Sequence, residues 1–239
     1  MRKNDIYEIE ITGMTHEAMG VGKADGMAVF VQGAIEGEKV IAKIIKVTRS
    51  YAVARVEDWL VKSPERREPF CPVYKRCGGC SLQHMTYDMQ LKFKQRVVID
   101  NLERIGGFKG INVNPVIGMD NPMNYRNKAQ YPVGMGDNRP VAGFYARRSH
   151  DIIDSESCGI QHTSSEKVKN TVIDIIKKLN IPVYNEKTGE GILRHIITRV
   201  SYSTGDIMVI LVVTKENVPG LDKLIKIIAG EIPEVKSIV

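Results

Sequence analysis

Three of the four cysteines of this 239-residue chain lie within one short segment, and this spacing constrains the fold more than any other feature. Cys71, Cys77 and Cys80 are separated by five and by two residues, and Cys158 lies far beyond them. Three close thiolates and a distant fourth are typical of a metal site that is closed by the tertiary fold. The Gly-Gly pair between Cys77 and Cys80 allows a tight backbone turn, so both sulfurs can address one centre.

The residues alone leave the nature of this centre open. A tetrahedral zinc ion and a [4Fe–4S] cluster both take four thiolates, and the N–H groups of a glycine-rich turn can donate to cluster sulfides. The C-x5-C-x2-C spacing departs from the paired C-x2-C repeats of common zinc sites, which argues against zinc. Structural disulfides are unusual in cytoplasmic proteins. Four unrelated buried thiols remain the alternative to a metal site.

The positive charge of the chain is concentrated in its middle third. The formal net charge is +6, but residues 61–150 carry 15 Lys and Arg against 7 Asp and Glu, a net +8. Residues 1–60 and 151–239 each carry a net charge of −1. Such clustering indicates a polyanionic partner such as nucleic acid. The alternative is a solvated basic face that binds nothing.

Residues 1–60 have the pattern of a small β-barrel. Short alternating or apolar segments are separated by glycine-containing turns, as expected for short paired strands. The expected strands are 6–11, 27–31, 39–47 and 51–56. The glycine-rich segment 20–23 precedes a strand and opens no helix, which argues against a phosphate-binding loop. Residues 62–69 are polar and contain two prolines, so we expect a linker.

The rest of the chain alternates between helical and strand patterns, which predicts an α+β domain. We expect one helix over 86–105 and another over 221–228, before Gly230. A third helix is expected to begin at Thr163, where Thr163 and Glu166 can form a capping box. Strands are expected over 124–133, 141–145, 193–202, 207–214 and from 235 onward. Because the sequence stops inside an apolar element, we expect it to be part of a larger protein.

Several motifs resemble the ribosomal-RNA uracil C5-methyltransferase family. They are Cys71-x5-Cys77-Gly78-Gly79-Cys80-Ser81-Leu82-Gln83-His84 with the later Cys158, the segment 125–129 (YRNKA), and the segment 143–154 (GFYARRSHDIID). Residues 1–60 are similar to that family's RNA-binding TRAM barrel, so the resemblance covers essentially the whole chain. It implies that Cys71, Cys77, Cys80 and Cys158 bind a [4Fe–4S] cluster, which moves our preference from zinc to iron–sulfur.

The resemblance also implies a chemistry. In such enzymes a Rossmann-like domain binds S-adenosylmethionine, a cysteine attacks C6 of the uracil, and a carboxylate removes the proton from C5. No cysteine follows Cys158, and no glycine-rich strand–loop–helix is present. We therefore expect that the Rossmann-like methyltransferase domain is absent, that no catalytic residue lies in this chain, and that S-adenosylmethionine binds only through the missing domain.

Basic and aromatic residues near the cysteines are the candidate RNA contacts. Arg and Lys position phosphates, and Tyr125 or Tyr145 can stack on unpaired bases. Solvated charges and half-buried tyrosines are the alternative for each position. The candidates are Lys75, Arg76, Tyr125, Arg126, Lys128, Arg139, Arg147 and Arg148.

These expectations combine into one interpretation. Residues 1–62 form a TRAM-like barrel, 63–85 a linker and cluster loop, and 86–239 an α+β central domain. The chain would be the RNA-recognition and iron–sulfur portion of a 23S rRNA uracil C5-methyltransferase, inactive in isolation, with a structural cluster. Alternatives are a non-catalytic RNA-binding iron–sulfur protein and a zinc-stabilised interaction module. Without a signal peptide or an apolar run of about 18 residues, we expect a cytoplasmic monomer that avoids membranes.

Overall fold

The computed structural model describes residues 1–239, and the chain divides into two compact units. Unit 1 comprises Met1–Pro69 and Ser81–Met119, and unit 2 comprises Phe70–Cys80 and Asp120–Val239. Residues 81–119 therefore group with the first unit, whereas we expected 86–239 to form one domain. A backbone hydrogen bond of 2.8 Å from Thr86 N to Glu65 O fastens the chain after residue 80 to unit 1. We call Phe70–Cys80 the cysteine loop.

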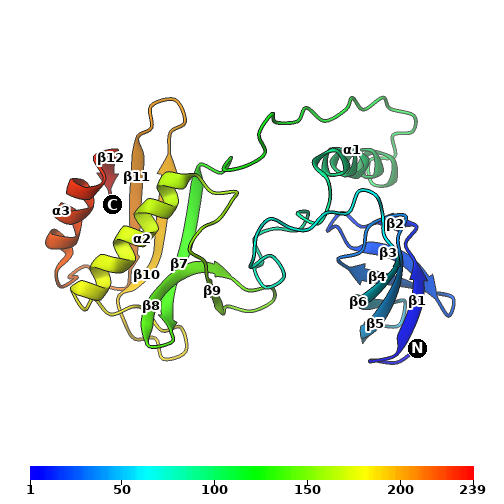
Figure 1. The fold of residues 1–239 in the computed structure, drawn as a ribbon, viewed down its shortest axis with the longest axis horizontal. Helices are drawn as coiled ribbons and strands as arrows, with labels where there is room; N and C mark the ends of the chain where they lie inside the picture. Colours follow the sequence, from blue (N-terminus) through cyan, green and yellow to red (C-terminus); the bar gives the residue numbers. More distant parts are fainter. The chain divides into compact units, whose positions relative to one another are not determined.

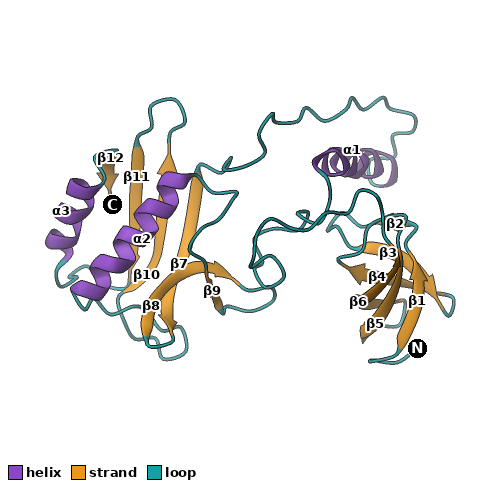
Figure 2. Ribbon diagram, viewed as in Figure 1, coloured by secondary structure: helices purple, strands orange, loops and turns teal.

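Unit 1 contains a six-stranded sheet (Figure 2). Thr12 N donates to Val21 O at 2.8 Å, which brings the chain after the first strand against the third, as in a barrel. Its strand order is β1-β5-β6-β4-β3-β2, and only β4 and β6 pair in parallel. Closure requires Gly22, because a Cβ there would lie 2.5 Å from Glu10 O on β1. The strands are β1 (Ile6–Glu10), β2 (Gly13–Met14), β3 (Gly20–Ala24), β4 (Met27–Gln32), β5 (Lys39–Val47) and β6 (Tyr51–Val61). The glycine-rich segment that we expected to precede a strand is thus itself strand β3.

A buried carboxylate ties the segment after the barrel back to it. Glu38 has no exposed surface, and its two oxygens accept from Arg66 Nε at 2.5 Å and from Arg66 Nη2 at 2.7 Å. Trp59 Nε1 donates to the same carboxylate at 3.2 Å. Burial alone would raise the pKa of Glu38, but Arg66 and the backbone N–H groups of Ile35 and Ser63 outweigh it and lower that pKa.

Helix α1 (Tyr87–Arg104) follows, close to its expected bounds. Thr86 is its N-cap and accepts from Met89 N at 3.3 Å. None of its residues is buried. The helix therefore contributes little to a packed core.

Unit 2 is a six-stranded sheet with two helices on one face (Figure 1). The strand order is β12-β11-β10-β7-β8-β9, and only β11 and β12 are parallel. On β7 the alternate residues Ala129, Tyr131 and Val133 join the core, as the sequence predicts. The elements are β7 (Lys128–Gly136), β8 (Arg139–Tyr145), β9 (Ile152–Asp154), α2 (Thr163–Lys178), β10 (Leu193–Val200), β11 (Ile207–Val213), α3 (Leu221–Glu231) and β12 (Val235–Ile238).

The start of α2 differs from the expected capping box. His162 is the N-cap, and its Nδ1 accepts from Ser164 N at 3.2 Å. Glu166 instead accepts from the hydroxyl of the buried Tyr131 at 2.7 Å and pairs with the buried Lys169 at 3.0 Å. The Glu166 carboxylate thus links α2 to Tyr131 of the sheet. It also neutralises the buried ammonium of Lys169, which needs a counter-ion.

None of the helices combines the length and the apolar composition that crossing a bilayer requires.

Candidate RNA-binding surface and cysteine loop

The cysteine loop runs along the end of β8. Cys77 and Ala146 form an isolated antiparallel bridge, and Gly78 N donates to Tyr145 O at 2.9 Å. A Cβ at residue 78 would lie 3.1 Å from the same Tyr145 O, so glycine suits this close approach. The first Gly of the Gly-Gly pair thus serves strand pairing as well as the turn.

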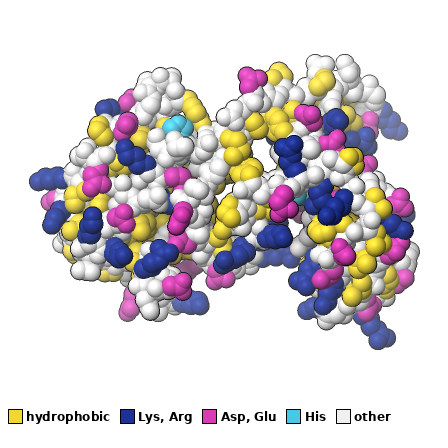
Figure 3. Space-filling view, viewed as in Figure 1, with side chains coloured by type: hydrophobic (Ala, Val, Ile, Leu, Met, Phe, Trp, Pro, Cys, Tyr) yellow, Lys and Arg dark blue, Asp and Glu magenta, His cyan; other side chains and the backbone are white.

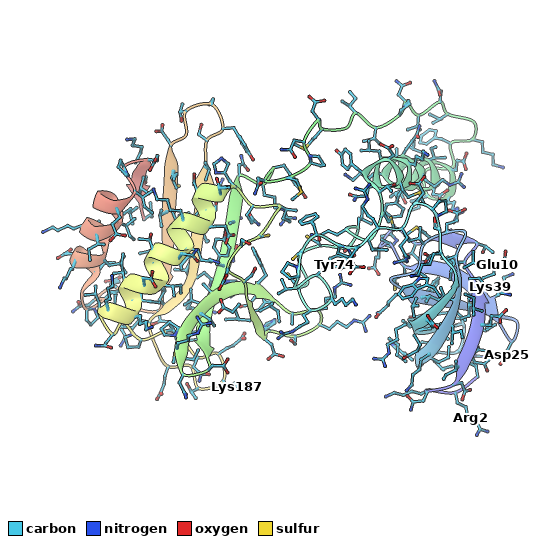
Figure 4. All side chains as sticks on the ribbon, in the orientation of Figure 1. Arg2, Glu10, Asp25, Lys39, Tyr74 and Lys187 are labelled. Carbon is cyan, nitrogen blue, oxygen red and sulfur yellow. The ribbon has the colours of Figure 1, made fainter.

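Arg147 holds this loop through its side chain. Its Nε donates to Cys77 O at 3.2 Å, and its Nη2 donates to Cys80 O at 2.7 Å. Its guanidinium also lies 5.2 Å from the ring centre of Tyr74, which is labelled in Figure 4. Arg147 was expected to contact RNA. In the structure these three contacts stabilise the conformation of the cysteine loop.

Cys158 lies beside the cysteine loop despite its distance in sequence. A Cβ on Gly159 would lie 2.6 Å from the ring of Phe70, the first residue of that loop. Burial raises the pKa of the Cys158 thiol; N–H groups of Ile160 and Gln161 oppose this shift, while the charges of Glu166 and Cys80 add to it. The fold therefore places Cys158 near Cys80 and its neighbour Gly159 against Phe70.

The side chains only partly fit a metal centre. None of the four cysteines forms a disulfide, and Gly79 N donates to Cys77 Sγ at 3.4 Å, as an amide near a cluster sulfur would. However, no group of three or more His, Cys, Asp or Glu side chains is arranged to hold a metal ion. The donor chemistry suits iron–sulfur ligation, whereas the geometry does not form the predicted centre.

All eight predicted RNA contacts lie in unit 2. Apart from Arg147 and Arg139, they form two groups of three residues. Lys75, Arg76 and Arg148 are exposed and lie where the cysteine loop meets the turn after β8, because Arg147 N donates to Arg76 O at 3.1 Å. We call these three residues the basic edge. Arg139 is separate from it, since it pairs with Asp154 at 2.7 Å near the β7–β8 turn.

The second group lies at the beginning of β7. Tyr125, Arg126 and Lys128 are exposed, and Arg126 N donates to Ile160 O at 2.9 Å. In the sheet register Lys128 is opposite Arg199 of β10, which is also exposed. Sequence reasoning missed Arg199, because the pairing of β7 with β10 is not local. The only available signal was its place among alternating residues of a predicted strand.

The charge of the middle third is divided between the two units. Residues 81–119, which include the basic side chains of α1, belong to unit 1, whereas residues 120–150 belong to unit 2. Lys and Arg are interspersed with Asp and Glu on the face shown in Figure 3. The candidate RNA-binding residues therefore form two groups in unit 2 and not one continuous basic region.

The chain is similar to known proteins in one domain and along its whole length. Residues 2–56 match the TRAM domain. An uncharacterized RNA methyltransferase of Halalkalibacterium halodurans is 46% identical over 239 residues, which are 100% of this chain and 52% of that protein. One of Listeria innocua is 44% identical with the same coverage. The chain thus spans about half the length of the curated relatives it matches.

A solved structure is similar over most of the chain. The crystal structure of Pyrococcus abyssi tRNA (uracil-54, C5)-methyltransferase in complex with S-adenosyl-L-homocysteine matches with a TM-score of 0.64 and 25% identity. The match covers 91% of this chain and 48% of that one.

These matches correct two expectations. We expected a fold class without the Rossmann-like methyltransferase domain, and this is wrong. The expected function, an inactive portion of a methyltransferase, is also wrong. Every part of the chain aligns with RNA methyltransferases, and the similar structure is that of an enzyme with bound S-adenosyl-L-homocysteine. The absence was inferred from the lack of a cysteine after Cys158 and of a glycine-rich strand–loop–helix, and these local patterns do not decide the fold class.

These matches identify neither an iron–sulfur cluster nor rRNA as the substrate. What the matches establish is that the chain carries a TRAM domain at residues 2–56 and is similar in sequence along its whole length to RNA methyltransferases.

Proposed function

We propose that this protein is an S-adenosylmethionine-dependent RNA methyltransferase that acts on C5 of uracil. The observation that carries the proposal is the similarity of 91% of the chain to a tRNA (uracil-54, C5)-methyltransferase crystallised with S-adenosyl-L-homocysteine. The TRAM domain and the whole-length similarity to RNA methyltransferases support it. S-adenosylmethionine, when bound, supplies the methyl group.

Residues of this chain bind and orient the RNA in this proposal. Lys128 and Arg199 lie side by side on neighbouring strands, so their cationic groups can contact adjacent phosphates. The basic edge offers a second phosphate-binding position on unit 2. Rigid strands suit this role because they fix the spacing of the charges.

Methyl transfer to defined RNAs tests the proposal. The protein is incubated with methyl-labelled S-adenosylmethionine and with either tRNA or 23S rRNA that lacks modifications, and the RNA is then digested to nucleosides. We expect the label in 5-methyluridine from one of the two RNAs. The rRNA arm tests the substrate expected from the sequence, and the tRNA arm tests the substrate named for the Pyrococcus abyssi enzyme. Label in another nucleoside would contradict the proposed chemistry.

We further propose that Cys71, Cys77, Cys80 and Cys158 ligate a [4Fe–4S] cluster. Their spacing and the approach of Cys158 to Cys80 support this. Anaerobically purified protein should be brown, with absorbance near 400 nm, and should contain about four iron and four sulfide per chain. Colourless protein with one zinc per chain would contradict the assignment, as would a Cys158→Ser variant with unchanged iron content.

A further inference from the structure

A group of aromatic and charged side chains lies beside the end of β8, apart from the two groups described above. It consists of Tyr145, His150, Tyr184, Glu186 and Arg194, which we call the Tyr145 cluster. Tyr145 ends β8, His150 precedes β9, Tyr184 and Glu186 lie between α2 and β10, and Arg194 is on β10. All five belong to unit 2. Two segments that are distant in sequence, 145–150 and 184–194, therefore meet here.

Two aromatic contacts build the cluster. The rings of Tyr145 and His150 are stacked, with centroids 4.9 Å apart and an interplanar angle of 25°. The guanidinium carbon of Arg194 lies 4.6 Å from the ring centre of Tyr184. Tyr145 is 36% exposed, so a planar group can still reach its ring. These contacts leave a stacked pair at the surface with a cation close by.

Glu186 joins the two halves of the cluster. His150 Nδ1 lies 2.9 Å from both carboxylate oxygens of Glu186. Burial and the negative charge of Glu186 raise the pKa of Tyr145, whereas the positive charge of Arg194 lowers it. Both charged side chains are therefore close enough to influence Tyr145. The side chain of Glu186 is 56% exposed. An ionised carboxylate has about four acceptor positions, so each oxygen retains lone pairs for a ligand beyond His150.

The loops that carry these residues are held by their own hydrogen bonds. Asn185 N donates to Glu190 O at 2.7 Å, and Gly189 N donates to Asn185 O at 2.9 Å. Gly191 permits the turn back to β10, because a Cβ there would lie 2.1 Å from Val183 O. The turn before β9 is closed by a bond of 2.8 Å from Ala146 N to Asp151 O. The cluster is therefore positioned before any ligand arrives.

We propose that the Tyr145 cluster binds an unpaired guanine of the RNA. The base would stack on the Tyr145–His150 pair, as bases stack on exposed aromatic side chains in single-stranded RNA recognition. Guanine carries adjacent N1–H and N2–H donors that match the two oxygens of Glu186. Arg148 and Lys187, which is labelled in Figure 4, are exposed on the same two loops and can contact the flanking phosphates.

This inference rests on the proposed RNA function, and binding measurements separate the two. Fluorescence anisotropy would give the affinity of the protein for oligouridylates with one central guanosine, inosine or adenosine. We expect guanosine to bind most tightly. Tyr145→Ala should weaken binding about tenfold, whereas Tyr145→Phe should retain it, because stacking needs the ring and not the hydroxyl.

A matched pair of loop variants tests the carboxylate. Glu186→Gln should remove most of the preference for guanosine over adenosine, whereas Glu190→Gln, an exposed change on the same loop, should leave it intact. Both positions are exposed, so folding should be preserved and circular dichroism can verify it. Equal binding of the three oligonucleotides by the wild type would overturn this inference and leave the proposed function standing. A wild type that binds no RNA would overturn both.

Discussion

The Arg147 side chain and the Cys80 backbone, 67 residues apart in sequence, are joined by a hydrogen bond of 2.7 Å from Nη2 to the carbonyl oxygen. The same guanidinium donates to Cys77 O at 3.2 Å. One basic residue thus fixes the two ends of the Cys77–Cys80 turn. Its neighbour Arg148, with a φ of +65°, is exposed and belongs to the basic edge.

Replacing Arg147 should loosen the cysteine loop. Each charge-assisted hydrogen bond contributes about 1.5–3 kcal/mol, so Arg147→Ala should expose the buried Cys77 at least about tenfold more often. Mass spectrometry of Cys77 alkylation over time, on metal-free protein, measures this opening. Arg148→Ala is the control and should leave the alkylation rate unchanged while weakening RNA binding. Equal alkylation rates in the two variants would contradict the scaffold role of Arg147.

Charge reversal at the start of β7 should weaken RNA binding in a salt-dependent way. Lys128→Glu and Arg199→Glu should each lower RNA affinity and reduce the slope of log affinity against log salt, by about 0.7 per lost contact on single strands. Titrations at several salt concentrations provide the slope. Arg139→Ala should have little effect, since Arg139 is paired with Asp154. An unchanged slope in both reversal variants would exclude this surface.

The Glu38–Arg66 pair should make the stability of unit 1 depend on pH. Because folding lowers the pKa of Glu38, its ionised form stabilises the fold above its ordinary pKa of 4.5. That contribution is lost as pH falls through the lower folded-state value. Glu38→Gln should reduce the free energy of unfolding by about 3 kcal/mol at neutral pH, because it leaves Arg66 without its counter-ion.

Trp59, the one tryptophan of the chain, reports on this pair directly. Its Nε1 donates to Glu38, and the Arg66 guanidinium lies 4.8 Å from its ring centre. Urea unfolding followed by Trp59 fluorescence should show the difference between wild type and Glu38→Gln shrinking in acid. A difference that is constant from neutral pH to pH values well below 4.5 would contradict the account.

Substitutions at the start of α2 distinguish the observed contacts from a capping box. Glu166→Ala removes the acceptor of Tyr131 and the partner of the buried Lys169, so it should cost about 3–5 kcal/mol of unfolding free energy. Thr163→Ala should cost under about 0.5 kcal/mol, as expected for an exposed position without such contacts. Urea denaturation followed by circular dichroism gives both values. A loss of about 1 kcal/mol for Thr163→Ala would indicate that the box is formed after all.

Local patterns predicted much of the fold. Alternation identified β5 at its exact bounds, Lys39–Val47, and helical periodicity with the following Gly-Gly identified α1 to within a residue at each end. These patterns succeed because each strand or helix buries one face, and its period is then visible in the sequence. Helix α3 runs one residue past Gly230, since packing of its apolar face outweighs the helix propensity of one glycine.

Long-range relationships were only partly predictable. Cysteine spacing predicted a shared site, and Cys158 does lie near Cys80, but no three of these side chains are grouped to hold a metal ion. The pairing of Lys128 with Arg199 and the assembly of the Tyr145 cluster arise from strand order and loop closure, which the sequence does not display. The role of Arg147 was likewise missed, since an arginine that holds carbonyl oxygens and one that binds phosphate have the same sequence pattern.

Nucleoside analysis of cells that lack this protein tests methylation of C5 of uracil in RNA most directly. Purified tRNA and rRNA from deletion and wild-type cells would be digested and quantified by mass spectrometry. The account predicts that 5-methyluridine disappears from one defined position of one RNA and returns when the gene is restored. Identical 5-methyluridine maps in both strains, or the loss of a different modified nucleoside, would contradict it.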